Sequence, residues 1–113
     1  MNELEELKAW CESVGYKIYP DHLTSKENMC KWIACKRLTG ALECETNKHK
    51  IQLVISPYMY FHNDANHLGC SVDITGERGG HWYKLQAYSL AATELKDSIN
   101  TIEQRLIDAW NAL

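Results

Sequence analysis

The chain has 113 residues, of which 45% are hydrophobic and 24% charged, and its formal net charge at pH 7 is −3. These values are typical of a single globular domain that buries its own core, and they argue against a disordered chain or a membrane protein. The pI of about 5.9 lies well below the basic values expected of a dedicated nucleic-acid-binding protein.

The first predicted element is a helix over residues 2–13. Leu4, Leu7 and Cys11 recur at steps of three and four, and Gly15 is a natural stop. Three glutamates in the first turn suit the positive end of the helix dipole. This acidic stretch lacks the basic and apolar regions of a signal peptide, so we expect a cytoplasmic protein.

The next segment gives a mixed signal. Residues 16–19 alternate in the manner of a short strand that Pro20 ends. Thr24 and Glu27 then show the pattern of a capping box, in which each side chain satisfies the other residue's backbone N–H. Residues 31–38 fit either a helix or a strand, and we prefer a short turn of helix followed by a strand.

Two hairpins are predicted in the middle of the chain. Apolar residues alternate over 42–46 and again over 51–55, with a polar turn between them. The cleanest alternation covers residues 68–75. The loop 76–80, which is rich in glycine, and a return strand over 81–88 complete the second hairpin.

The strongest pattern is a long C-terminal helix, because the period of the sequence changes from Ser89 onward. Its apolar positions are spaced by three and four: Leu95, Ile99, Ile102, Leu106, Trp110 and Leu113. Alternating strands need a cover for one face, and the apolar stripes that could supply it belong to the two terminal helices.

The sequence therefore predicts a single α+β domain over residues 1–113. We expect an antiparallel sheet of about four to six strands, two hairpins included, covered on one face by the N- and C-terminal helices. The other face is expected to be wet because it carries polar residues: Glu43, Glu45, Lys50, Gln52, Ser71, Asp73, Lys84 and Gln86.

An aromatic cluster follows the strand of residues 50–56. Rigid aromatic side chains at a loop supply contact area at little entropic cost, so we interpret the cluster as a protein-binding surface. The alternative is that the strand simply continues and half of the side chains enter the core. The predicted partner-binding residues are Tyr58, Tyr60, Phe61, His62 and Trp82.

A group of imidazole, carboxylate and thiol side chains comes next in the sequence. His62, Asp64 and His67 lie within six residues, and Cys70 and His81 could approach them. Zinc accepts such donors, but their spacing matches no zinc motif, so we predict neither a metal nor another cofactor. The chain also lacks a Gly-x-Ser-x-Gly elbow, and no catalytic residue is predicted.

The five cysteines are an odd number at irregular spacing, which argues against a disulfide framework. We expect them to be reduced. Cys11, Cys44 and Cys70 fall on predicted apolar faces, where cysteine packs as a small hydrophobe.

Residues 15–50 carry more basic than acidic side chains, whereas the flanking segments are acidic. This distribution keeps nucleic-acid binding open as a disfavoured alternative. The order helix, strands, helix is similar in outline to a double-stranded-RNA-binding domain, but Ser89 to Glu94 lacks that family's basic helix start. The ending Ile107-Asp108-Ala109-Trp110-Asn111 resembles that of small phage-borne restriction-alleviation proteins, whose Cys-x-x-Cys pairs are absent here.

The leading functional hypothesis is a small non-enzymatic protein that binds another macromolecule. Its most specific form is a bacterial or phage accessory or inhibitor protein that contacts a host protein. The alternatives are an enzyme with a cryptic site at His62, Asp64, His67 and Cys70, and a nucleic-acid binder that uses the basic middle. A homodimer is also left open, and no membrane association is predicted.

Overall fold

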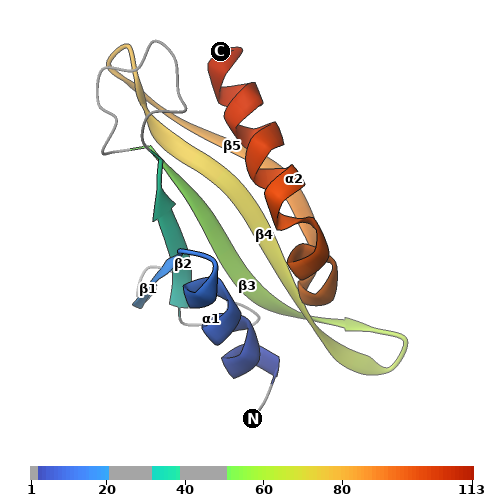
Figure 1. The fold of residues 1–113 in the computed structure, drawn as a ribbon. Helices are drawn as coiled ribbons and strands as arrows, with labels where there is room; N and C mark the ends of the chain where they lie inside the picture. Colours follow the sequence, from blue (N-terminus) through green and yellow to red (C-terminus); the bar gives the residue numbers. More distant parts are fainter. Residues whose placement is uncertain (1–2, 21–31, 39–50) are drawn as a thin grey trace.

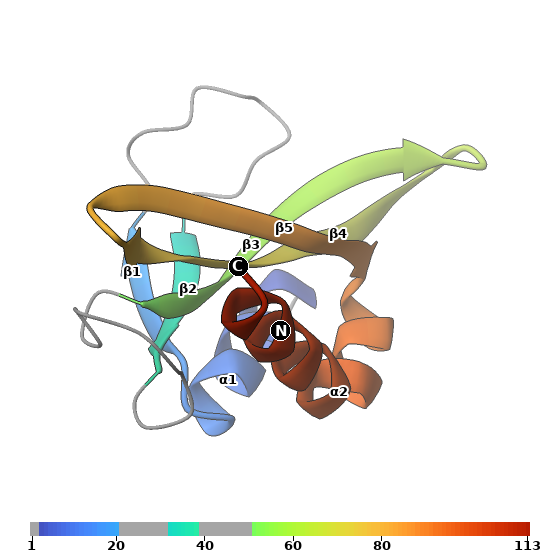
Figure 2. The same ribbon diagram turned by 90° about the horizontal axis from the view of Figure 1, so that it is seen from above.

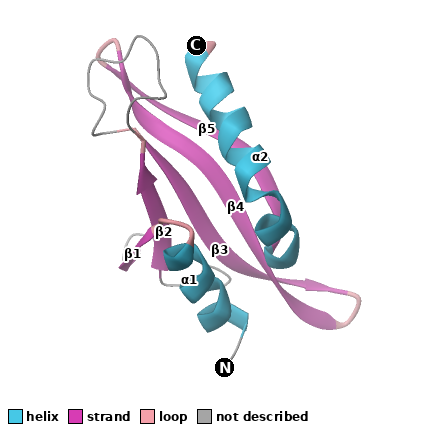
Figure 3. Ribbon diagram, viewed as in Figure 1, coloured by secondary structure: helices cyan, strands magenta, loops and turns pink. Residues whose placement is uncertain are grey.

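A computed structural model describes residues 3–20, 32–38 and 51–113 of the chain. Within these residues, five strands form one antiparallel sheet in the order β1-β2-β3-β4-β5, with helices α1 before them and α2 after them (Figures 1 and 3). This confirms the predicted α+β fold. In chain order the elements are α1 (Glu3–Ser13), β1 (Lys17–Pro20), β2 (Trp32–Arg37), β3 (Gln52–His62), β4 (Ala65–Arg78), β5 (His81–Ala91) and α2 (Ala92–Asn111).

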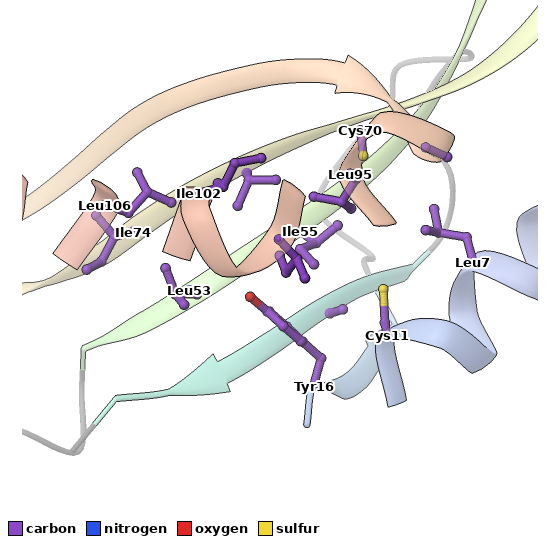
Figure 4. Packing of buried hydrophobic residues seen from close by; sticks show 14 of the residues in the cluster. Leu7, Cys11, Tyr16, Leu53, Ile55, Cys70, Ile74, Leu95, Ile102 and Leu106 are labelled. Atoms are coloured by element: carbon purple, nitrogen blue, oxygen red, sulfur yellow. The ribbon is translucent and has the colours of Figure 1, made fainter. Parts of the chain in front are cut away.

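Both helices lie on the same face of the sheet, as expected (Figure 2). The core fills the space between them and the sheet, and Figure 4 shows it from close by. Its side chains come from α1, from the inward positions of the central strands and from one stripe of α2. Those fully or almost fully buried include Leu7, Cys11, Leu53, Ile55, Val72, Ile74, Leu95, Ile102, Leu106 and Trp110.

A polar contact ties α2 to the first strands. The Tyr16 hydroxyl donates a hydrogen bond to Glu103 Oε2 over 2.8 Å, and Lys36 Nζ lies 3.1 Å from the same oxygen. Lys36 therefore turns toward the helical side of the sheet, where its charge is paired.

Two-residue turns join the three long strands. Asn63 and Asp64 connect β3 to β4 with φ angles of 53° and 58°, and Gly79 and Gly80 connect β4 to β5 with φ angles of 60° and 84°. Positive φ at both central residues gives the twist that matches a tight hairpin. The β4–β5 hairpin was predicted, whereas the β3–β4 hairpin was not. The predicted partner of residues 51–55, over 42–46, lies outside the described residues.

The end of α2 requires one correction to the predicted apolar stripe. Leu113 follows the last helical residue and is 45% exposed, so it does not belong to the core. The start of α2 also differs from the prediction, because β5 continues through Ala91 and the helix begins at Ala92.

The face of the sheet opposite the helices is not uniformly wet. Asp73 is only 3% exposed, and its neighbours Cys35, Val54 and Thr75 are buried as well. The register places all four on that face. Lys84 is exposed, as expected, and Glu43, Glu45 and Lys50 lie outside the described residues. The expectation of a wet face was therefore wrong for Asp73.

Candidate partner-binding hairpin

The β3–β4 hairpin extends beyond the part of the sheet that the helices cover (Figures 1 and 2). Side chains are buried up to Pro57 on β3 and again from Leu68 on β4, whereas residues 59–66 are all exposed. The alternative in which the strand continues is thus correct for the backbone. Its side chains past Pro57 nevertheless do not enter the core, because no helix covers this end of the hairpin.

One face of this hairpin is a ladder of aromatic rings, which we call the tyrosine–histidine face and define as Tyr58, Tyr60, His62 and His67. The ring centroids of Tyr60 and His67 are 5.3 Å apart and nearly parallel, and those of Tyr58 and Tyr60 are 6.0 Å apart. His67 Nε2 lies 3.0 Å from the backbone oxygen of His62. The Tyr58 hydroxyl forms a hydrogen bond with Ser89 on β5. These contacts hold the rings in place before any partner arrives.

The opposite face of the hairpin is apolar. Met59 and Phe61 alternate with the tyrosines and therefore point the other way. Phe61 is the most exposed large apolar side chain described, at 69%. Met59 and Leu68, together with Glu3 and Leu4 from α1, line a hollow of about 360 Å³. The exposed Phe61 side chain is thus on the same face of the hairpin as a largely apolar hollow.

Trp82 does not join this surface. It pairs with Glu77 near the far end of β4, whereas the hairpin tip pairs Tyr60 with His67. At the usual strand rise the two pairs are about 33 Å apart along β4. Trp82 is 61% exposed. Four of the five predicted partner-binding residues therefore lie together on the hairpin, and Trp82 lies apart from them.

The alternative catalytic site keeps its two histidines together, with ring centroids 6.3 Å apart, but not its thiol. His67 and Cys70 are three positions apart on one strand, so they face opposite sides of the sheet. Burial raises the pKa of the Cys70 thiol to about 12, which disfavours the nucleophilic thiolate. His81 lies at the other end of β4. Within residues 3–20, 32–38 and 51–113, no group of three or more metal-ligating side chains gathers.

The most unusual charge in the sheet is that of Asp73. Its Oδ2 lies 3.7 Å from Lys84 Nζ, too far for a hydrogen bond, and its Oδ1 has no hydrogen-bond partner among the described residues. Burial raises the pKa of Asp73, and Lys84 offsets part of this rise. Burial, with a smaller contribution from Asp73, also raises the pKa of Cys35 to about 11. The ionised Asp73 carboxylate therefore lowers the stability of the fold.

Asp73→Asn is expected to increase the free energy of unfolding at neutral pH, because an amide of the same shape carries no charge to desolvate. The pKa of Asp73 is higher in the folded than in the unfolded state, so the wild type regains stability as the pH falls through the folded-state pKa. The stability gained by Asp73→Asn should therefore be smaller at low pH than at neutral pH. Urea unfolding at about pH 7 and about pH 4 measures this, with the exposed Asp97→Asn as control. A less stable variant at pH 7 would mean that the Lys84 pairing dominates.

Comparison with known proteins identifies no relative: no family model, curated protein or solved structure matches the chain. No helix in the described part of the chain is long and apolar enough to cross a membrane.

Proposed function

We propose that the chain is a non-enzymatic protein-binding module whose contact surface is the tip of the β3–β4 hairpin. The observation that carries this proposal is the exposure of Phe61, Met59 and Tyr60 on a paired, rigid element beyond the core. Large exposed apolar side chains are costly to leave in water, and aromatic residues dominate the binding energy of many interfaces.

The two faces of the hairpin suit different parts of an interface. Phe61 can enter an apolar pocket of a partner, whereas the tyrosine–histidine face offers ring surface with polar atoms at its edges. Ring stacking holds Tyr60 against His67, and strand pairing fixes the backbone that carries both faces. Less conformational entropy is then lost on binding, which favours affinity.

The most specific form of the proposal is a cytoplasmic bacterial or phage accessory or inhibitor protein that occupies a groove on a host protein. A projecting hairpin with an apolar anchor supports this form, since it can enter a concave surface that a flat sheet cannot. The enzyme alternative is weakened because Cys70 faces away from the tip histidines. The nucleic-acid alternative is weakened by the acidic helices, with four acidic residues against one basic in α1 and four against two in α2.

The test begins with capture of a partner from bacterial lysate, its identification by mass spectrometry and its purification. Phe61→Ala and Tyr60→Ala are then expected to weaken binding by about 1 kcal/mol or more in calorimetry. The melting temperature of the free chain should hardly change, because both side chains lie outside the core.

Trp82→Ala is the matched control, since Trp82 is also an exposed aromatic side chain but lies at the far end of the sheet. It should bind the partner as the wild type does. Wild-type affinity in both hairpin variants would refute the proposal. Equal losses in all three variants would point to a contact surface that spans the whole sheet.

A further inference from the structure

A hollow of about 460 Å³ lies at the edge of the sheet formed by β1 and β2. Three of the residues around it are cations, and none of the described residues around it is acidic. This composition is unusual for a chain whose net charge is −3. The residues that line the hollow are Gly15, Lys17, Tyr19, Cys35, Lys36, Arg37 and Gln52.

The strand register brings the polar side chains to one side of the sheet. Lys17 pairs with Cys35, and Arg37 pairs with Gln52 two positions further along β2. Side chains two apart on a strand share a face, so Lys17, Arg37 and Gln52 all point away from the helices. Lys17 Nζ lies 5.5 Å from the centroid of the Tyr19 ring, which keeps the ammonium group at the hollow.

The cations at the hollow differ in how their charge is satisfied. Lys36 is paired with Glu103 on the helical side. Lys17 and Arg37 form no ion pair with any described carboxylate, and both are exposed. Among the described residues, neither charge therefore has an ion-pair partner, and the buried carboxylate on this face, Asp73, lies beside Lys84 instead.

We propose that this hollow binds a small phosphorylated molecule through Lys17 and Arg37. A phosphate monoester carries a charge of about −1.5 to −2 at pH 7, which matches the two positive charges of Lys17 and Arg37. The guanidinium fork of Arg37 fits two phosphate oxygens, and the Gln52 amide and Tyr19 hydroxyl add donors. The volume falls within the range of small-molecule sites, about 300–1,000 Å³.

A free small molecule fits the hollow better than a nucleic acid does. Two cations neutralise too few phosphates to hold a polyanion against the salt of the cell. The site is also separate from the proposed partner-binding hairpin, because Gln52 begins β3 and His62 ends it, about 33 Å away. Either proposal can therefore fail without the other.

Titration of the full-length chain with inorganic phosphate and with adenosine monophosphate, followed by amide NMR, tests the proposal. We expect saturable shifts with one-to-one stoichiometry, concentrated at Gly15, Cys35, Arg37 and Gln52. Arg37→Gln should weaken binding by about tenfold or more, because a charge-assisted pair is lost. Lys17→Gln should also weaken it.

Arg105→Gln is the control, since Arg105 is an exposed cation on α2, on the other side of the sheet. It should leave the affinity unchanged, and unaltered thermal melts of all three variants would show that each is folded. Shifts that do not saturate, or equal affinity in Arg37→Gln and the wild type, would overturn the proposal. Tight binding of a single-stranded oligonucleotide without binding of the two small probes would also overturn it.

Discussion

Replacing Ile102 with alanine is expected to lower the free energy of unfolding by about 2–5 kcal/mol. Ile102 is 3% exposed and lies in the middle of the α2 stripe that packs on the sheet. The substitution removes apolar contacts and leaves a cavity that the surrounding strands can fill only in part. This loss is a large fraction of the ~5–15 kcal/mol that typically stabilises a domain. Urea unfolding followed by circular dichroism measures it.

Thr101→Ala is the control for Ile102→Ala, because Thr101 is the neighbouring residue on the exposed side of α2. It should change stability by no more than about 0.5 kcal/mol. An alternative is that the α2 stripe serves a helix-to-helix homodimer and is uncovered in the monomer. An Ile102→Ala variant that melts like the wild type but dissociates in sedimentation would favour that hypothesis over core packing.

Gly76→Ala is expected to destabilise the domain by about 1–3 kcal/mol through overpacking. A Cβ at this position would lie 2.6 Å from Ile51 Cγ1 and 3.1 Å from both Ile51 Cα and Trp110 Cη2. Ile51 and Trp110 are fully buried, so neither can move aside freely. Thermal and urea unfolding of the variant measure the cost.

A double-mutant cycle with Ile51→Ala shows whether the clash itself is responsible. Removal of Ile51 Cγ1 takes away the closest contact, so Gly76→Ala should cost less in the Ile51→Ala background than in the wild type. Strict additivity of the two substitutions would assign the effect to the conformation of β4 rather than to lack of space.

Elements with one clearly buried face could be predicted from the sequence. The helical spacing that ends at Trp110 and the alternation around Val72 and Ile74 both describe contacts with the core, and the core is where the structure places these residues. The Gly79–Gly80 turn could also be predicted, because glycine is the residue best suited to two successive positive φ angles.

The β3–β4 turn was missed for a physical reason. Asn63 and Asp64 tolerate positive φ, but the same residues also occur in open polar loops. Beyond the core both faces of a strand are exposed, so no alternation marks its continuation through Tyr60 and Phe61. The Asn63–Asp64 pair, directly after a run of aromatic residues, was the one available signal.

Other features of the sites depend on pairing between distant segments. Lys17 and Arg37 are far apart in the sequence, and only the β1–β2 register brings them to the same hollow. The remoteness of Trp82 follows likewise from the length of β4. Asp73 sits at a polar position of an alternating strand, and no local pattern indicates that this position is buried.

The placement of α2 after the five described strands has a consequence for synthesis of the protein. The sheet pairs in chain order, so each strand can join its neighbour once both have left the ribosome. The inward side chains Ile55, Val72 and Ile74 stay uncovered until the 20 residues of α2 follow. At translation rates of about 5–20 residues per second this takes about 1–4 s. During that interval the nascent chain presents its largest apolar surface to chaperones and to neighbouring chains.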